Sequence, residues 1–363
     1  MKDKNDPVIP DPSPTYYTFE GSIGTNDNST IITNDQNLLI SGTNSGKVCL
    51  LKISESGLLL WRKDFEENSG PLTSVVQSTD HNIFLCGYTY RNVFSSDIDV
   101  LLVKTNEYGD TIWSKTYGGT SGDFGYYIRN GIDGNLLVGG ISFSHSSDHA
   151  SDIYLMKVNL NGDTVWTRTY VDPGVEIPHH LLQMGNGEIL ITGYESNTSK
   201  GVYLLKLNAQ GSPLWNKKIS SPVPQEGLST IELPNGDLVT CGKSTRDSYD
   251  KVLVIKFDSF GNVLWGREYG DEYYSEQGNS ITINTDGTFT ITGTYFEPHS
   301  GQNGIIILKL DADGNQLVLK SFGEGFDDSG QNILKDENGD NIITGNHNGN
   351  IFMTRTDNNG VFK

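Results

Sequence analysis

Short apolar runs separated by tight-turn residues recur along the whole chain. Residues 133–140 read DGNLLVGG, and residues 152–170 read DIYLMKVNLNGDTVWTRTY. Asp-Gly or Asn-Gly between runs of about six apolar and β-branched residues is the strongest short-range signal for a β-hairpin. With the preceding run 125–130, this stretch predicts four strands, A to D, with tight turns from A to B and from C to D.

The four-strand unit repeats about every fifty residues. All five tryptophans stand in strand D of successive units, 52, 53, 49 and 50 residues apart, and Val318 takes the Trp place in a sixth copy. A glycine ends strand B and a basic residue ends strand C in seven units each. The tryptophans are Trp61, Trp113, Trp166, Trp215 and Trp265; the glycines are Gly42, Gly87, Gly140, Gly193, Gly242, Gly293 and Gly345; the basic residues are Lys52, Lys104, Lys157, Lys206, Lys256, Lys309 and Arg355.

The two ends of the chain complete the seventh unit. Six full sets run from Thr30 to about Phe322, whereas the seventh has strands A, B and C and stops at Lys363. Residues 16–21 (YYTFEG) precede the first A strand and can supply the missing D strand, which would hide the open edges of a ring. Four-stranded units at this period indicate propeller blades. The sequence therefore predicts an all-β, seven-bladed β-propeller of antiparallel blades, one domain over residues 16–363.

Composition adds three limits. Residues 1–15 carry four of the twelve prolines and almost nothing apolar, which predicts a flexible linker. A net charge of -19 argues against nucleic acid as a partner, and no apolar stretch is long enough to cross a membrane. Cys49, Cys86 and Cys241 lie in strand-like runs without CxxC spacing, so we expect buried small side chains rather than a metal or redox site.

The repeated pattern GD-x-hydrophobic-W-x-K-x-Y-G, followed by a turn and a strand that ends in Gly, resembles the propeller repeats of secreted and surface-anchored bacterial proteins. The resemblance spans the chain from about Tyr16 onward and implies a scaffold or binding platform, here expected as a monomer. The start MKDKNDP and its proline-rich continuation resemble a mature bacterial lipoprotein whose anchoring Cys was replaced by Met. The resemblance thus implies an extracytoplasmic, lipid-anchored protein.

Functional residues are expected where the units differ. The loops from B to C and from D to A share one end of the ring, and the loops at 88–99, 141–152 and 294–303 are long. Aromatic rings beside polar groups suit sugar faces and protein epitopes alike, although loop aromatics can also simply pack their own loops. The candidate binding residues are Tyr88, Tyr90, Tyr126, His179, His180, Tyr273, Tyr274, Tyr295 and His299, with Phe94, Tyr194 and Phe296 nearby.

Six of the seven histidines also map to this half: His145, His149, His179, His180, His299 and His347. His179 and His180 begin the innermost strand of blade 4. Because neighbours on a regular strand point to opposite sides, we expect the pair to hydrogen-bond between blades rather than to chelate one metal ion.

Two groups of carboxylates could bind a cation. Asp123, Glu276 and Asp328 each stand two residues before the glycine that opens strand A, with Glu226 beside Gly227; they either ring the central mouth or brace local turns. Residues 311–315 (DADGN) resemble part of a calcium loop, but they fall where the other blades carry a hairpin turn. No cofactor is therefore expected, and Ca²⁺ is the one cation considered.

Two functions follow from these patterns. The first is a non-catalytic binding or scaffold protein that recognises glycan or protein through its long-loop face. The alternative is a carbohydrate-active hydrolase or lyase that uses the axial pocket. No nucleophile elbow, phosphate loop or HExxH motif supports catalysis.

Overall fold

A computed structural model describes residues 16–23, 29–65, 69–90, 98–144, 151–171, 176–195, 200–325 and 328–363. This described part contains 28 β-strands and no α-helix, so the all-β prediction is confirmed. The predicted linker at residues 1–15 lies outside it, as do Phe94, His145 and His149. No helix among the described residues is long and apolar enough to span a membrane.

The strands follow the predicted A to D order. The A strands are β2 (Thr30–Ile32), β6 (Ser69–Gln77), β10 (Asp123–Asn130), β14 (Glu176–Gln183), β18 (Gln225–Glu232), β22 (Ser275–Ile283) and β26 (Ser329–Lys335). The B strands are β3 (Leu38–Asn44), β7 (Ile83–Tyr90), β11 (Leu136–Ser142), β15 (Ile189–Glu195), β19 (Leu238–Arg246), β23 (Phe289–Glu297) and β27 (Asn341–His347). The C strands are β4 (Lys47–Ile53), β8 (Ile98–Thr105), β12 (Asp152–Val158), β16 (Val202–Leu207), β20 (Tyr249–Phe257), β24 (Gln302–Leu310) and β28 (Asn350–Thr356). The D strands are β5 (Leu59–Asp64), β9 (Thr111–Tyr117), β13 (Thr164–Tyr170), β17 (Pro213–Ile219), β21 (Val263–Tyr269), β25 (Gln316–Gly325) and β1 (Tyr17–Glu20).

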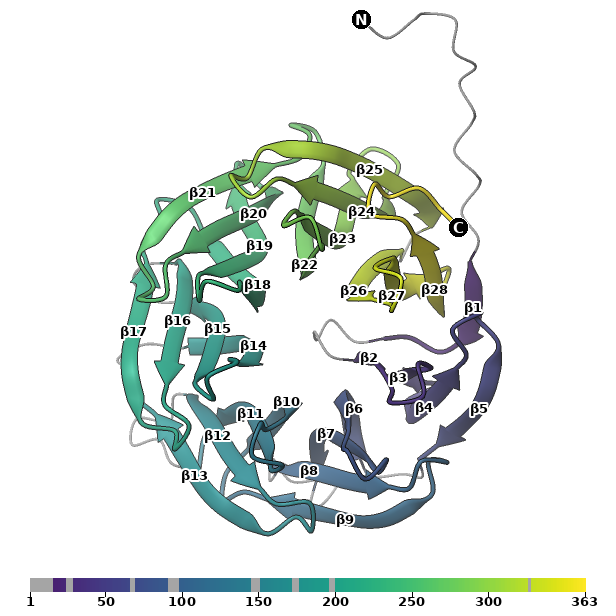
Figure 1. The fold of residues 1–363 in the computed structure, drawn as a ribbon, viewed down its shortest axis with the longest axis vertical. Helices are drawn as coiled ribbons and strands as arrows, with labels where there is room; N and C mark the ends of the chain where they lie inside the picture. The colour runs from purple at the N-terminus through teal and green to yellow at the C-terminus, as the bar shows by residue number, and fades with distance from the viewer. Residues whose placement is uncertain are drawn as a thin grey trace, which may run out of the picture.

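The strands form seven separate four-stranded antiparallel sheets arranged in a ring (Figure 1). Each A strand lies next to the centre and each D strand lies on the outer wall. Six sheets use consecutive strands, and the seventh has the order β1-β28-β27-β26. The predicted seven-bladed β-propeller is confirmed; we number the blades 1 to 7 from β2.

Both chain ends build the last D strand. β1 pairs with β28, from Tyr17 opposite Met353 to Glu20 opposite Asn350. Phe362 forms an isolated bridge with Thr356 further along β28. The N-terminal segment supplies the D strand as predicted. Phe362, near the C-terminus, pairs with the end of β28 beyond the part that β1 covers.

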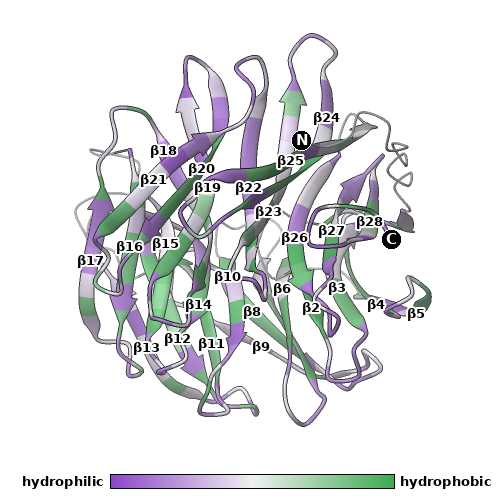
Figure 2. Cartoon of the chain, turned by 45° about the horizontal axis from the view of Figure 1, so that its top comes forward, coloured by the Kyte–Doolittle hydropathy of each residue, from purple (hydrophilic) through white to green (hydrophobic). Residues whose placement is uncertain are grey.

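The core lies between neighbouring blades rather than within one sheet. B and C strands are almost fully buried, and each apolar cluster draws on two adjacent blades. Figure 2 shows hydrophobic stretches along the strands of the ring. The D-strand tryptophans pack against the C-D turn of the next blade, where a β-carbon on the turn glycine would lie only 2.9–3.0 Å from the ring. These glycines also have positive φ values, from 76° to 81°, so glycine is required there both sterically and conformationally.

The repeated basic residue of strand C serves as a tie between turns. Lys157 lies 2.8 Å from Asp133 in the A-B turn of its own blade and donates to the Ala209 carbonyl oxygen in the C-D turn of the next, at 3.2 Å. An acid faces the basic residue in all seven blades. The sequence showed the basic residues, but not that five of them also bond the C-D turn of the next blade.

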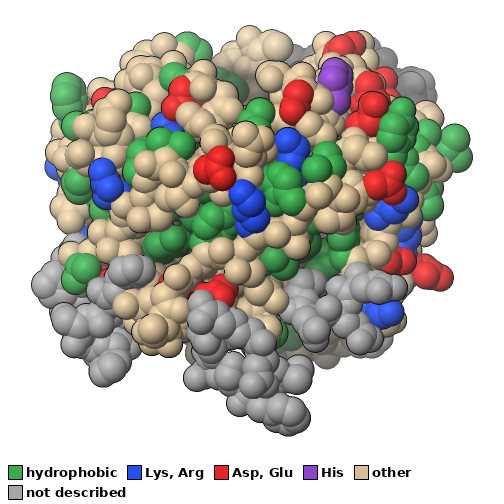
Figure 3. Space-filling model, turned by 90° about the horizontal axis from the view of Figure 1, so that it is seen from below, with side chains coloured by type: hydrophobic (Ala, Val, Ile, Leu, Met, Phe, Trp, Pro, Cys, Tyr) green, Lys and Arg blue, Asp and Glu red, His purple; other side chains and the backbone are tan. Residues whose placement is uncertain are grey.

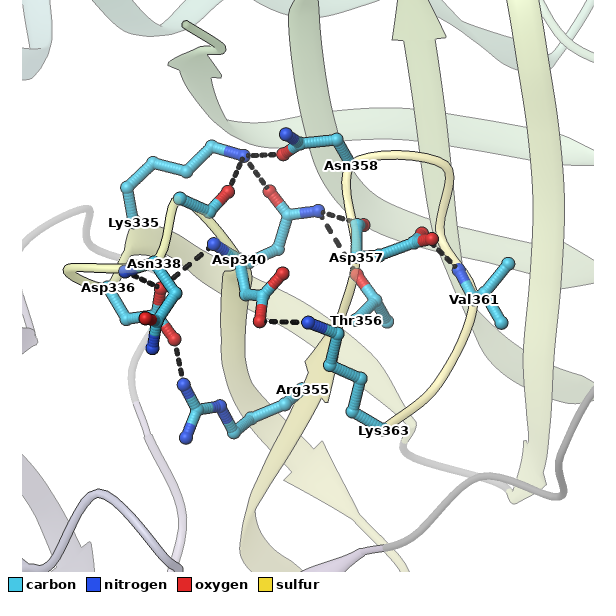
Figure 4. Close-up of polar contacts among 12 residues, drawn as sticks. Lys335, Asp336, Asn338, Asp340, Arg355, Thr356, Asp357, Asn358, Val361 and Lys363 are labelled. Carbon is cyan, nitrogen blue, oxygen red and sulfur yellow. Dashed lines mark hydrogen bonds and ion pairs between the residues drawn. The ribbon is translucent and has the colours of Figure 1, made fainter.

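In blade 7 the same tie uses Arg355 and fastens the chain end (Figure 4). Arg355 pairs with Asp336 and donates to the Glu55 carbonyl oxygen of blade 1 at 3.2 Å. Lys335 bonds Asn358 and Asn341, and the C-terminal Lys363 pairs with Asp340. This network holds the turn that follows β28 and thereby secures the ring at its seam.

Candidate functional site

The ring has two chemically different faces. The turn face carries the A-B and C-D hairpin turns, and the loop face carries the B-C and D-A loops. The three cysteines belong to neither face, since all are buried and free in strands. The predicted binding residues belong to the loop-face ends of the strands.

A continuous aromatic cluster joins blades 2 and 3 on the loop face. The Tyr88 ring of β7 lies 6.0 Å from Tyr90 and 5.0 Å from Phe124 of β10, measured between centroids. Phe124 in turn stacks on Tyr126 at 6.2 Å and meets Phe143 edge-on at 6.3 Å. We call these five residues the aromatic cluster; it reaches from the B strand of blade 2 to the innermost strand of blade 3.

Exposure is graded along the aromatic cluster. Tyr90 is 43% exposed, whereas the other four rings are half-buried. Burial and the neighbouring Tyr88 raise the pKa of Tyr126 to about 12, and burial also raises the pKa of Tyr88. Both phenols are therefore neutral hydroxyls at ordinary pH, suited to hydrogen bonding.

The tyrosines of blade 6 form a second, smaller group. Tyr274 meets Tyr295 edge-on at 5.9 Å, and the Tyr295 hydroxyl donates to the Gly323 carbonyl oxygen at 3.3 Å. Tyr273 is 69% exposed, and His299 is exposed in the B-C loop. Tyr274 and Tyr295 therefore pack the loops of their own blade, whereas Tyr273 and His299 lie on the surface.

A β-bulge sits at the same place in six A strands. The pairing register shifts between Pro178 and His180, and likewise at the equivalent positions of blades 2, 3, 5, 6 and 7. A bulge re-aims side chains and interrupts strict alternation. The rule that placed His179 and His180 on opposite sides therefore does not hold here, although their surroundings differ: His180 is buried, while the His179 side chain is 27% exposed.

His179 faces charged groups of the next blade. Its Nε2 lies 3.7 Å from Glu226 Oε2, and Lys243 Nζ lies 3.4 Å from the other oxygen of the same carboxylate. Burial, with a smaller effect of the Lys243 ammonium, lowers the pKa of His179 to about 4. The imidazole is thus neutral at physiological pH and can accept or donate one hydrogen bond near the axis.

The carboxylates of the predicted cation ring brace their own loops. Asp123 accepts from Gly119 N at 2.7 Å and from the Ser144 hydroxyl at 2.6 Å. Glu276 accepts from Asp271 N at 2.7 Å, and Asp328 accepts from Asn348 N at 3.0 Å. Among the described residues, no three His, Cys, Asp or Glu side chains are grouped so that they could hold a metal ion.

Asp311 behaves as a turn residue. Its Oδ1 accepts from Asp313 N at 2.9 Å and from Asn315 N at 2.8 Å. Asn159 makes the same pair of bonds in blade 3, to Asn161 N and Asp163 N. Calcium binding at residues 311–315 would therefore have to displace hydrogen bonds that define the hairpin.

Sequence reasoning missed three residues of this face. Phe124 and Phe143 complete the aromatic cluster. Glu176 occupies the register position of Asp123 and Glu276, is 1% exposed, and lies 3.2 Å from Lys218 Nζ. Phe124 could have been found as an aromatic residue at a position that is Ile177, Glu226 or Gln277 elsewhere.

Comparisons with known proteins agree on the architecture. No protein-family model matches the sequence, and no curated protein does either. Among solved structures, the WD40 propeller domain of Doa1 is similar with a TM-score of 0.61 at 11% identity, over 96% of this chain and 98% of that one. The WD40 domain of Neurospora crassa Pan2 has a TM-score of 0.57 at 13% identity, over 96% and 91%.

An enzyme shares the same architecture. An ulvan lyase of a polysaccharide lyase family, bound to a saccharide, has a TM-score of 0.61 at 10% identity, over 94% of this chain and 95% of that one. Two WD40 domains and a lyase thus have comparable TM-scores with this chain. Identities this low establish the fold alone.

Proposed function

We propose that this chain is a carbohydrate-binding propeller that recognises a glycan through the loop face of blades 2 and 3, without catalysis. The observation that carries the proposal is the aromatic cluster. Sugars present apolar C–H faces that stack on aromatic rings and hydroxyls that need hydrogen-bond partners. The aromatic cluster offers both, with an exposed Tyr90 at its rim and neutral phenols along it.

Packing favours a binding role for the aromatic cluster over simple loop filling. Tyr88 belongs to blade 2 and Phe124 to blade 3, so the rings bridge two blades instead of filling one loop. A platform fixed to two blades loses little conformational freedom when a ligand stacks on it, which favours binding.

The carboxylate geometry speaks against a glycosidase at the axis. Glycoside hydrolysis needs two carboxyl groups free to act as acid and base. Asp123, Glu276 and Asp328 already accept loop hydrogen bonds. A lyase or hydrolase would have to draw on His179 and Glu226, the pair that still faces charged neighbours.

Affinity electrophoresis through gels containing a panel of soluble polysaccharides tests the proposal. The wild-type protein should be retarded by at least one polysaccharide, and Tyr88→Ala and Tyr90→Ala should abolish the retardation. Tyr108→Ala is the matched control, because Tyr108 is a 60% exposed aromatic residue on a turn-face hairpin.

A reducing-sugar assay on the same panel separates binding from turnover. We expect no release of reducing ends. If the wild-type protein releases reducing ends and Glu226→Gln does not, the protein is a hydrolase and the binding proposal is wrong. Absence of retardation by every polysaccharide would leave a protein epitope as the ligand of this face.

A further inference from the structure

An apolar cavity of about 540 Å³ opens on the turn face between blades 5 and 6. It lies away from the aromatic cluster and is lined by the A-B turns of blades 5 and 6 and by the C-D turn of blade 6. Its lining includes Leu233, Pro234, Ile283, Phe289 and Ala312. A volume of this size is in the range that binds small molecules or single large side chains.

The cavity lies where a hydrogen bond that joins other neighbouring blades cannot form. At three other junctions, those of blades 1 and 2, 3 and 4, and 4 and 5, the second residue of the A-B turn donates its N–H to the last A-strand side chain of the next blade. These bonds are Asn34 N to Gln77 Oε1 at 2.9 Å, Ile132 N to Gln183 Oε1 at 2.9 Å, and Gly185 N to Glu232 Oε2 at 2.8 Å. At the junction of blades 5 and 6 the donor position is Pro234, which has no N–H, and the acceptor position is Ile283.

The lysine tie is missing at the same junction. Lys104, Lys157 and Lys206 each donate to a carbonyl oxygen in the C-D turn of the next blade, at 3.1–3.2 Å. Lys256 instead pairs only with Asp237 of its own blade, at 3.8 Å, among the residues that the structure describes. Among the described residues, the junction of blades 5 and 6 thus lacks the N–H donor, the side-chain acceptor and the lysine contact with the next turn. An apolar gap remains there, whereas polar contacts close the neighbouring junctions.

The rim of the cavity is acidic. Asp286 stands between the lining residues Thr285 and Gly287, and Asp311 and Asp313 flank Ala312. Hydrogen bonds from Thr288 and Asn315 hold the pKa values of Asp286 and Asp311 below their usual range, so both are charged at neutral pH. With Asp237 they give four carboxylates. The nearby cations are Lys256 and Lys309, whose side chains are only 17% and 8% exposed, the half-buried Lys335 and the exposed Arg267.

We propose that this cavity is a docking site for a protein segment that inserts one large apolar side chain between lysine or arginine residues. The apolar lining takes the anchor, and the acidic rim takes the flanking cations. A glycan suits this cavity poorly, because its lining offers few polar groups. The site is distinct from the loop face and does not depend on the glycan proposal.

Fluorescence anisotropy with labelled peptides tests the docking site. The probe has two lysines on each side of a Phe-Leu pair, and two comparison peptides replace the lysines with glutamates or the Phe-Leu pair with Gly-Gly. The lysine-flanked Phe-Leu peptide should bind, and each comparison peptide should bind at least about tenfold more weakly.

Two variants locate the binding on the protein. Ala312→Trp fills the cavity and should weaken peptide binding by at least about tenfold. Ala209→Trp is the matched control, because Ala209 holds the same turn position in blade 4 and should leave binding unchanged. Ile283→Gln restores the polar residue of the other junctions and should weaken binding without adding bulk.

Three results would overturn the docking site. One is equal binding of the glutamate-flanked peptide, and another is binding that Ala312→Trp leaves intact. The third is absence of binding by the lysine-flanked peptide at millimolar concentration while circular dichroism shows a folded protein.

Discussion

At the scale of single residues, His179 is held near the axis by charged groups of the next blade. Its Nε2 lies 3.7 Å from Glu226, and burial lowers its pKa to about 4 from an ordinary 6.5. Because the folded protein binds this proton less readily than the unfolded chain does, protonation favours unfolding. The contribution of His179 to stability is therefore complete above about pH 6.5 and is lost as the pH falls towards 4.

NMR titration of the imidazole resonances checks this assignment. His179 should stay neutral from pH 7 to pH 5. Lys243→Met should raise the pKa of His179, since it removes a neighbouring positive charge. A His179 resonance that titrates above pH 6 in the wild type would contradict the assignment.

The tryptophan of strand D is a second residue-scale test. Trp113 packs on the turn glycine of blade 3 and on the core between blades 2 and 3. Trp113→Ala should lower the free energy of unfolding by about 3 kcal/mol, measured in urea. The adjacent Ile112 is 53% exposed, so Ile112→Ala should cost less than about 0.5 kcal/mol. Equal costs for the two variants would show that the ring does not serve as an inter-blade wedge.

Exposed apolar side chains of this kind recur on the outer wall. Each residue before the Trp position points outward: Leu60, Ile112, Val165, Leu214, Leu264 and Leu317 are 45–53% exposed. Figure 3 shows hydrophobic side chains interspersed with charged ones on that wall. Because they occur once in each of blades 1 to 6, they belong to the repeat rather than to a single site.

At the scale of the elements, the turns of neighbouring blades are locked by the strand C lysines. Burial raises the pKa of Asp133, but hydrogen bonds from Lys157 and Asn135 outweigh it and hold the pKa below its usual range. The tie therefore stabilises the fold above about pH 4 and weakens as acid protonates the carboxylate.

Asp133→Asn measures one such tie. Lys157 is 5% exposed and Asp133 is 44% exposed, so solvent screening keeps the expected loss near about 1 kcal/mol at pH 7. The loss should shrink below pH 3, where the wild-type carboxylate is also neutral. Asp163→Asn removes a surface partner of Lys115 and should cost clearly less than Asp133→Asn, because solvent screens an exposed pair. A loss that does not change with pH would exclude the charged tie.

The β-strands and their order were the easiest part of the structure to predict from the sequence. Asp-Gly and Asn-Gly turns fix hairpins locally, so strand order and blade count follow from short motifs such as residues 133–140. The loop-face site could be predicted from the sequence only in part. Tyr88, Tyr90 and Tyr126 were identified as loop aromatics, but their contact through Phe124 depends on how blades 2 and 3 pack.

The β-bulges were not predictable from the letters. A bulge is a mismatch in register between two strands. Pro178 stands where this mismatch begins, but proline is also found at the first residue of a strand and on edge strands, so it does not by itself mark a bulge. The argument that set the two histidines on opposite sides assumed regular pairing, so the bulge removes that argument. The carbonyl partners of Lys104, Lys157 and Lys206 were hidden likewise, because each lies in a turn of the adjacent blade.

At the scale of the whole molecule, the ring depends on its N-terminal strand. β1 pairs with β28, and the Tyr16 ring stacks on His347 at 4.6 Å beside Asp328. Deleting residues 1–21 should expose the edge of β28 and lower the melting temperature, read by differential scanning calorimetry. Deleting only residues 1–15 should leave it unchanged. A protein that melts at the full-length temperature without β1 would exclude closure by this strand.

Both faces of the closed ring then carry a feature that the repeat does not explain. The loop face holds the aromatic cluster, and the turn face holds the cavity between blades 5 and 6. Residues that recur from blade to blade hold the ring together, and these two departures are the sites that we propose for recognition. The binding proposal for the aromatic cluster is the central claim.

Isothermal titration calorimetry with an oligosaccharide from the retarding polysaccharide tests that claim most directly. Phe124→Ala and Tyr90→Ala should each weaken binding by at least about tenfold, or about 1.4 kcal/mol, while Tyr273→Ala and Tyr108→Ala leave it unchanged. Unaltered affinity in Phe124→Ala and Tyr90→Ala, with both proteins folded, would contradict the assignment of the glycan site to blades 2 and 3.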